Sequence, residues 1–404
     1  MPYRILSLDG GGSWAILEAM AIGTLYGFDT KGTTILKQFD LAVSNSGGSI
    51  MLAALAIDFT PQRLIDLLNE ENERKLIFVK NFLSFTGLER YDTKAKLAGL
   101  REVMGPAGDQ LVNTLGSPCK LLFCTFDYDR MRAQFFRSDA NSPAAGSPGA
   151  PQPTLAEAVH ASSNAPVKYF DAPAQFNTPA FAGRRYWDGA MGGFNNPTMA
   201  GVTEALAYGV KAADIQVLSL GTANVFLPMP SPMPDPGSGG QDPLCVPIDD
   251  SGLYHDLSKA AATILDDPPD QASFVAHLVI SGASALSQDA AKPVTNGNVV
   301  RLNPLIQPVK TNNVWGVPPL LANAPVPSVQ ANYSTDAEAF MALVNLDMDA
   351  VEQNEVDLIS TLGRTWLADA SPNQPIRVNS ELEPLIGHGT FSAAWKQAKA
   401  LGLV

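Results

Sequence analysis

A short apolar run meets a cluster of very small residues in Leu41-Ala42-Val43-Ser44-Asn45-Ser46-Gly47-Gly48-Ser49-Ile50, and a helix-like pattern follows at once. This is the pattern of a nucleophile elbow, a sharp turn from strand to helix that presents a serine at its tip. Only very small neighbours allow the backbone to turn so tightly. Ser46 would stand at the tip, beside a helix N-terminus that favours negative charge. Alone the motif is weak, because Ser- and Gly-rich strand–helix turns are common in α/β proteins.

Two further turns carry residues of the kind that such a serine needs. Asp9-Gly10-Gly11-Gly12 closes a buried strand predicted at 3–8, and Asp188-Gly189-Ala190 follows a short strand-like run. In a mostly parallel sheet, these turns and Ser46 would all lie at the carboxyl ends of strands, where such folds place their sites. The glycines offer backbone N–H groups without side chains in the way, as an oxyanion hole requires. A serine hydroxyl needs a base to take its proton, and Asp188 is the candidate.

In this combination and order, the motifs resemble those of the patatin-like phospholipase family over roughly residues 3–222. That family has an Asp-Gly-Gly-Gly turn, then a Gly-x-Ser-x-Gly elbow, and an Asp-Gly-Gly/Ala motif further on. The resemblance implies a three-layer α/β/α fold with a mostly parallel central sheet and extra C-terminal helices. It implies Ser46 as nucleophile, Asp188 as general base and Gly10, Gly11 and Gly12 as the oxyanion hole. The remaining motif positions are Asp9, Ser44, Gly48 and Gly189.

The reaction implied by the resemblance is hydrolysis of carboxylic esters of lipids, of the phospholipase A or carboxylesterase type, through an acyl-enzyme. A lipid or other ester is the implied substrate, and peripheral contact with lipid aggregates is compatible with it. Neither a metal nor a cofactor is required. Two departures bear on this expectation: Ser13-Trp14-Ala15 stands where the family usually has x-Arg-Gly, and Ser44 replaces the first elbow glycine. The missing arginine removes a charge that could help an oxyanion or a phosphate group.

Two other interpretations stay open. Ser46, Asp188 and His388 occur in the chain order of an α/β-hydrolase triad. The position of Ser46 argues against such a triad, because a nucleophile so near the N-terminus leaves room for only one strand before the strand that leads into the elbow. The run Gly10–Ala15 also fits a dinucleotide-binding fingerprint, with Asp29 about 20 residues further on. However, Asp29 stands in a loop-like stretch, whereas the ribose-binding acid should end the second strand.

Composition narrows the class of protein. The chain has 404 residues, of which 46% are hydrophobic and 17% charged, with a formal net charge of −13. Such an acidic chain is not expected to bind nucleic acid by bulk electrostatics. The three cysteines fit no zinc spacing. No apolar run approaches the ~20 residues of a membrane span, and no secretory signal is visible. We therefore expect a cytoplasmic protein, with export independent of a signal still open.

Strand-like runs alternate with helical patterns through the first half, which predicts a mostly parallel sheet covered by helices. We expect one catalytic domain over 1–370 and a C-terminal tail, 371–404, packed on it. Residues 226–247 are dense in proline and glycine and are predicted to form a mobile loop at the entrance to the site. Helices are predicted at 49–57, 61–73, 93–104, 154–163 and 198–208, and further strands at 39–43, 120–126, 133–136, 215–220 and 299–302.

Overall fold

The computed structural model describes residues 1–79, 91–166, 169–234, 242–248, 251–252, 256, 259, 269–282, 286–312, 314–323, 326–347 and 350–404. A seven-stranded sheet runs through the middle of the molecule in the order β4-β3-β2-β1-β6-β8, and β5 also pairs with β3. Its strands are β1 (Tyr3–Leu8), β2 (Leu41–Ser44), β3 (Lys120–Asp127), β4 (Arg132–Arg137), β5 (Tyr186–Asp188), β6 (Ile215–Leu220) and β8 (Val299–Leu302).

The five central strands, from β3 to β8, are parallel, while β4 and β5 run antiparallel to β3. Parallel strands are buried on both faces, which is why β1 and β6 are nearly continuous apolar runs. The register sets Leu8 beside Ser44 and beside Leu220, so three strands end at the same level. The predicted α/β fold with a mostly parallel sheet is confirmed.

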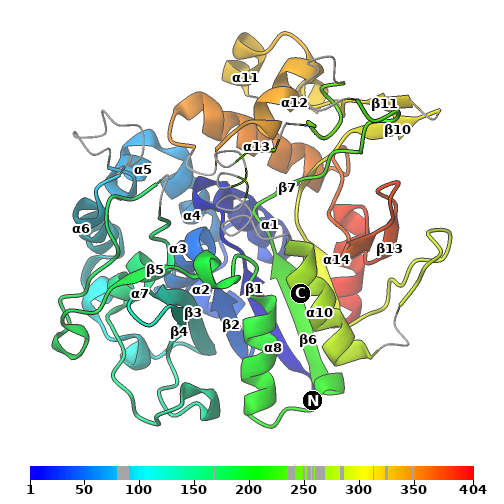
Figure 1. Cartoon of the computed structure of the whole chain (residues 1–404). Coiled ribbons are helices and arrows are strands. Elements are labelled where there is room, and N and C mark those ends of the chain that lie inside the picture. The colour runs from blue at the N-terminus through cyan, green and yellow to red at the C-terminus, as the bar shows by residue number, and fades with distance from the viewer. Residues whose placement is uncertain are drawn as a thin grey trace.

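Two apolar cores lie on the two faces of the sheet and make the structure three-layered. Side chains alternate along each strand, so Leu6 and Leu8 of β1 enter one core and Ile5 enters the other. The first core contains α1 (Ile16–Tyr26), α3 (Ser46–Ala56) and α7 (Leu155–Ser162). The second contains α8 (Thr198–Ala207) and α10 (Pro269–Ser281), which lie in front of the sheet in Figure 1.

The remaining helices pack around the first core. They are α2 (Gly32–Leu36), α4 (Pro61–Asn69), α5 (Glu71–Ile77), α6 (Thr93–Met104), α11 (Pro327–Asn332), α12 (Asp336–Val344), α13 (Gln353–Leu367) and α14 (Phe391–Ala400). The single helix expected over 61–73 is wrong: Glu70 is extended, with φ −84° and ψ 117°, and separates α4 from α5. Among the described residues, no helix is long and apolar enough to cross a membrane.

The C-terminal segment joins both cores. Strands β12 (Arg377–Val378) and β13 (Pro384–Ile386) form a small antiparallel pair that brings Ile386 into the second core. Phe391 of α14 enters the first core and meets the Trp366 ring of α13, with 4.9 Å between ring centroids. Removing this segment would therefore uncover apolar surface on both faces of the sheet.

The segment after β6 is more ordered at its start than its composition suggests. Strand β7 (Asn224–Val225) pairs with β9 (Leu305–Ile306), and the Phe226 amide donates to the Ile306 carbonyl, with 3.0 Å between N and O. The Val246 amide donates to the Pro228 carbonyl and so ties the two arms of the loop together. A separate hairpin joins β10 (Val309–Thr311) to β11 (Val314–Gly316). Residues 235–241 lie outside the described residues, and the mobility of 226–247 stays a prediction.

Candidate active site

Ser46 occupies the tip of a strained turn between β2 and α3. Its φ of 47° is a backbone angle that a residue with a side chain rarely adopts, and such strain gathers at functional sites. The neighbouring glycines are required by close backbone contact. A Cβ on Gly48 would lie 2.5 Å from the carbonyl oxygens of Leu8 and Asp9, and one on Gly47 would lie 2.6 Å from the Gly12 carbonyl oxygen. The turn therefore has the geometry of a nucleophile elbow.

Ser44 stands where the family has the first glycine of the elbow, and its hydroxyl joins a chain of hydrogen-bonded serine hydroxyls. Its Oγ lies 3.0 Å from Oγ of Ser49, which lies 2.8 Å from Oγ of Ser162 in α7. The Ser46 amide donates to the same Ser162 hydroxyl, with 3.2 Å between N and Oγ. The extra side chain thus links the elbow to α7. The Ser46 amide therefore already has an acceptor, the Ser162 hydroxyl.

Asp188 ends β5 and lies beside the elbow. Its Oδ1 accepts from Asn45 Nδ2 and from the Ala190 amide, both at 2.9 Å, and the Ser46 side chain lies near enough to lower the pKa of the carboxyl. Asp188 is 1% exposed and Ser46 8%. Burial raises the pKa of Asp188, and these hydrogen bonds oppose the rise. The structure therefore brings the sequence-predicted nucleophile and base together.

The glycine after Asp188 is also explained by contact. A Cβ on Gly189 would lie 2.3 Å from Asn45 Oδ1 and 2.9 Å from the backbone carbonyl carbon of Cys124. Any larger residue would push Asn45 away from the Asp188 carboxylate. Asn45 itself was not singled out from the sequence, although it stands next to Ser46 in the elbow. A side-chain amide at that position is the signal that could have revealed it.

Lys96 of α6 is a second residue that sequence reasoning missed. It is 1% exposed, and its Nζ donates to the Ser163 carbonyl and lies 4.1 Å from the centroid of the Phe170 ring. The Asp188 amide donates to the carbonyl of the next residue, Asn164, so Lys96 and Asp188 hold the same short segment. Burial lowers the pKa of Lys96 to about 7, while the Asp188 charge raises it. Its positive charge in turn lowers the pKa of Asp188.

The glycine turn after β1 lies against the elbow, but its three amides differ. The Gly10 amide donates to the Asn195 carbonyl, with 2.7 Å between N and O. Within the described part of the chain, no acceptor is found for the amides of Gly11 and Gly12. A Cβ on Gly10 would lie 3.0 Å from the Ser46 Cβ, so the turn borders the serine directly. Gly12 has a φ of 55°, which suits a residue without a side chain.

Asp9, the first residue of that turn, supports the backbone. Its carboxylate pairs with Arg301 of β8, with 2.6 Å between Oδ2 and a guanidinium nitrogen, and both side chains are 2% exposed. Its amide donates to Glu18 Oε1 at 2.7 Å. Burial raises the pKa of Asp9 to about 6 against the opposing effect of Arg301, and burial raises the pKa of Glu18 as well. Arg301 thus supplies a buried positive charge near the turn from a distant part of the chain.

The residues of the two rival interpretations lie elsewhere. His388 lies beside β13 and α14, close to Gln397 and Thr295. Helix α14 contacts β8, which is separated from β2 by β1 and β6. Asp29 lies between α1 and α2, whereas β2 ends at Ser44. Among the described residues, no histidine is hydrogen-bonded to Asp188, and no cluster of His, Cys, Asp or Glu could hold a metal ion.

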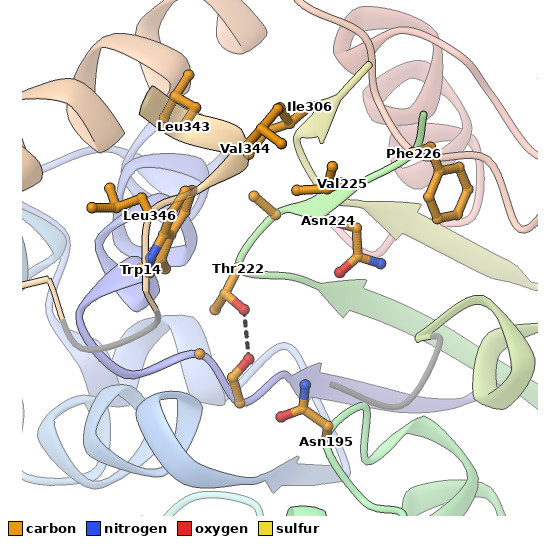
Figure 2. Close-up of a pocket in the computed structure, with 13 residues that line it drawn as sticks. Trp14, Asn195, Thr222, Asn224, Val225, Phe226, Ile306, Leu343, Val344 and Leu346 are labelled. Atoms are coloured by element: carbon orange, nitrogen blue, oxygen red, sulfur yellow. Dashed lines mark hydrogen bonds between the residues drawn. The ribbon is translucent and has the colours of Figure 1, made fainter. Parts of the chain in front are cut away.

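Two hollows adjoin the glycine turn on its two sides. The smaller, of about 30 Å³, is bordered by Ser46 and Gly12 and by a group of aromatic rings: Phe78, Tyr91, Tyr169 and Phe170. The larger, of about 420 Å³, is bordered by Gly10 and Gly11. Figure 2 shows its apolar side chains, with Trp14 on one side and Val225 and Phe226 on the other. A hydrophobic wall thus stands next to the turn that borders the serine.

The family model Patatin-like phospholipase matches residues 6–202, the part of the chain that holds the glycine turn, the elbow and the Asp188 turn. This part of the chain, 6–202, is thus similar to the patatin-like phospholipase family, which supports a hydrolase of the lipid acyl hydrolase kind. Among solved structures, the chain is similar to VipD from Legionella pneumophila, with 11% sequence identity and a TM-score of 0.37 over 99% of this chain and 75% of that one. No curated protein matches the chain.

Proposed function

We propose that the protein hydrolyses carboxylic esters of lipids through an acyl-enzyme on Ser46, with Asp188 as general base. The observation that carries this proposal is that Asn45, next to Ser46 at the tip of a strained elbow, donates to the buried Asp188 carboxylate at 2.9 Å and so holds that carboxylate beside the serine. A hydroxyl becomes an effective nucleophile when an adjacent base takes its proton. His388, the histidine of the alternative triad, lies beside β13 and α14 instead.

In the first step, Ser46 Oγ attacks the ester carbonyl carbon while its proton passes to Asp188. Negative charge then develops on the carbonyl oxygen and needs N–H donors aimed at it. The Gly10 amide is engaged with Asn195, so we assign this role to the amides of Gly11 and Gly12. The tetrahedral intermediate expels the alcohol, which takes the proton from Asp188. Asp188 then activates water, which hydrolyses the acyl-enzyme and regenerates the serine.

The surroundings of Asp188 favour this use of a carboxylate. A general base works best when its pKa approaches the working pH, and burial shifts the Asp188 pKa in that direction. Asn45 and the Ala190 amide hold the carboxylate in position, so little reorganisation is needed when the proton moves. The hydrogen bonds to the carboxylate and the positive charge of Lys96 oppose part of the effect of burial on the Asp188 pKa.

Hydrolysis of p-nitrophenyl esters and of phospholipid vesicles tests the proposal, with Ser46→Ala as the inactive variant. Ser334→Ala, an exposed serine at the start of α12, is the matched control. We expect activity in the native protein and the control, and none above background in Ser46→Ala. We also expect EDTA and NAD(P) to leave the rate unchanged. Equal rates in Ser46→Ala and the native protein would overturn the proposal.

A further inference from the structure

The larger hollow lies at the point of the sheet where the strand order reverses. From β1 the chain adds β2 and β3 on one side, and it later returns to place β6 and β8 on the other. Ligands of open α/β sheets bind at the carboxyl ends of the strands at such a point. The hollow lies there, because Gly10 and Gly11 follow β1 and residues 222–226 follow β6. Its volume of about 420 Å³ is within the usual range of ligand pockets.

The lining of this hollow is suited to a hydrocarbon chain. Apolar side chains surround most of it: Trp14, Val225, Phe226, Ile306, Leu343 and Leu346 (Figure 2). Its polar groups, from Asn195, Thr222 and Asn224, are uncharged, and no described residue that lines it is charged. Trp14 is held in place because its Nε1 donates to the Asp347 carbonyl, with 3.1 Å between N and O. Such walls favour an apolar ligand without a charged group.

The polar end of the hollow faces the catalytic turn. Thr222 Oγ1 donates to the Gly10 carbonyl, with 2.5 Å between the oxygens, and this bond is visible at the foot of the hollow in Figure 2. Gly10 in turn borders the Ser46 side chain. The small hollow on the serine side, at about 30 Å³, has room for roughly one or two water molecules. Of the two hollows that border the glycine turn, only the larger therefore has the volume for a fatty chain.

We propose that the hollow walled by Trp14, Phe226, Ile306 and Leu343 is the acyl chamber of the enzyme, which receives the fatty chain of the ester that Ser46 cleaves. The inference rests on the proposed function. The ester carbonyl lies at the glycine turn, and the chain extends past Thr222 toward α12. Trp14 is then a specificity-determining residue, because its ring forms the wall against which the chain packs.

A pair of opposite changes tests the chamber. Val344→Trp adds an indole at the wall of the hollow and should shorten the preferred chain. Trp14→Ala removes a ring and should favour longer chains. Val314→Trp is the matched control, because it adds the same volume at a side chain that is 68% exposed and does not line the hollow. Thermal unfolding of each variant shows that it is folded.

The readout is the ratio of kcat/KM for p-nitrophenyl octanoate to that for the acetate. We expect at least about a tenfold fall in this ratio for Val344→Trp, because filling an apolar pocket by even one methylene group changes discrimination by roughly 10–200-fold. Val314→Trp should keep the native ratio, and Trp14→Ala should raise kcat/KM for the palmitate relative to that for the octanoate. An octanoate-to-acetate ratio equal to the native one in folded Val344→Trp would overturn the assignment of this hollow as the acyl chamber.

Labelling separates this failure from a failure of the proposed function. A short-chain fluorophosphonate reaches Ser46 without filling the chamber, so its labelling rate reports on the serine separately from the chamber. Normal labelling together with an unchanged octanoate-to-acetate ratio would reject the chamber and leave the serine hydrolase in place. A native protein that is neither labelled nor active on any ester would reject the proposed function, and the chamber with it.

Discussion

Asp188→Asn should nearly abolish activity without unfolding the protein. The amide oxygen of asparagine can still accept from Asn45 Nδ2 and from the Ala190 amide, which both donate at 2.9 Å to one oxygen of the native side chain. We therefore expect a change in unfolding free energy within about 1 kcal/mol. The NH₂ group cannot take the Ser46 proton. Loss of a general base costs about 10²–10⁴ in rate, or roughly 3–5 kcal/mol of transition-state stabilisation.

The assay is the rate at which a fluorophosphonate labels Ser46, measured beside the thermal unfolding of each variant. The matched control is His388→Ala, which removes the imidazole that a triad would need and leaves Asp188 intact. We expect very slow labelling of Asp188→Asn and a near-native rate for His388→Ala. Fast labelling of folded Asp188→Asn, together with a dead His388→Ala, would refute the Ser–Asp mechanism, because imidazole would then be the proton carrier.

Three further outcomes follow from the same surroundings. Lys96→Met should move the acid limb of the pH profile of kcat/KM to higher pH, because loss of the ammonium charge raises the Asp188 pKa. The difference from the native pH profile should be largest below about pH 7, where Lys96 is charged. Gly48→Ala should lower the unfolding free energy by about 1–3 kcal/mol or more, since its Cβ would lie 2.5 Å from two carbonyl oxygens, whereas Gly252→Ala, with nothing within 4 Å, should unfold like the native protein. Burial raises the Asp9 pKa from 3.8 to about 6, so its protonated form is favoured in the folded state and its contribution to stability is lost as pH rises through about 6. Urea unfolding at pH 5 and 7 should show a larger loss in the native protein than in Asp9→Asn, where the raised pKa of Glu18 still contributes.

The sequence predicts the elbow and its base because each motif is a local run with a fixed geometric meaning. Ser46 needs its glycines within two residues, and Asp188 needs the glycine that follows it. Lys96 and Arg301 could not be found in this way, since their partners are brought to them only by the folded sheet. A partial signal exists for Lys96: it stands four residues before Leu100, on the buried face of a helix, where a lysine is unusual.

The same distinction between local and tertiary signals explains which helix and strand boundaries the sequence predicts. The strands 3–8, 215–220 and 299–302 are found where predicted, because a strand buried on both faces is a continuous apolar run. The break between α4 and α5 at Glu70 is not marked by a Pro or a Gly in the sequence. Helix α5 packs against α6, and such a tertiary contact cannot be predicted from the local sequence. The pairing of β7 with β9 likewise joins residues some 80 positions apart, and no local pattern near the prolines predicts it.

The two departures from the family pattern have different physical consequences. Ser44 adds a hydroxyl inside the elbow, and this hydroxyl is connected through the Ser49 hydroxyl to that of Ser162 in α7. Trp14 changes the hollow beyond the glycine turn, yet its own amide also donates to the Gly11 carbonyl, with 3.0 Å between N and O. That bond is made by the backbone, so Trp14→Ala keeps it and removes only the ring, together with its hydrogen bond to the Asp347 carbonyl. A change in chain preference at constant labelling rate would therefore assign the effect of Trp14 to the chamber, whereas a lower labelling rate would assign it to the position of the Gly11 and Gly12 amides.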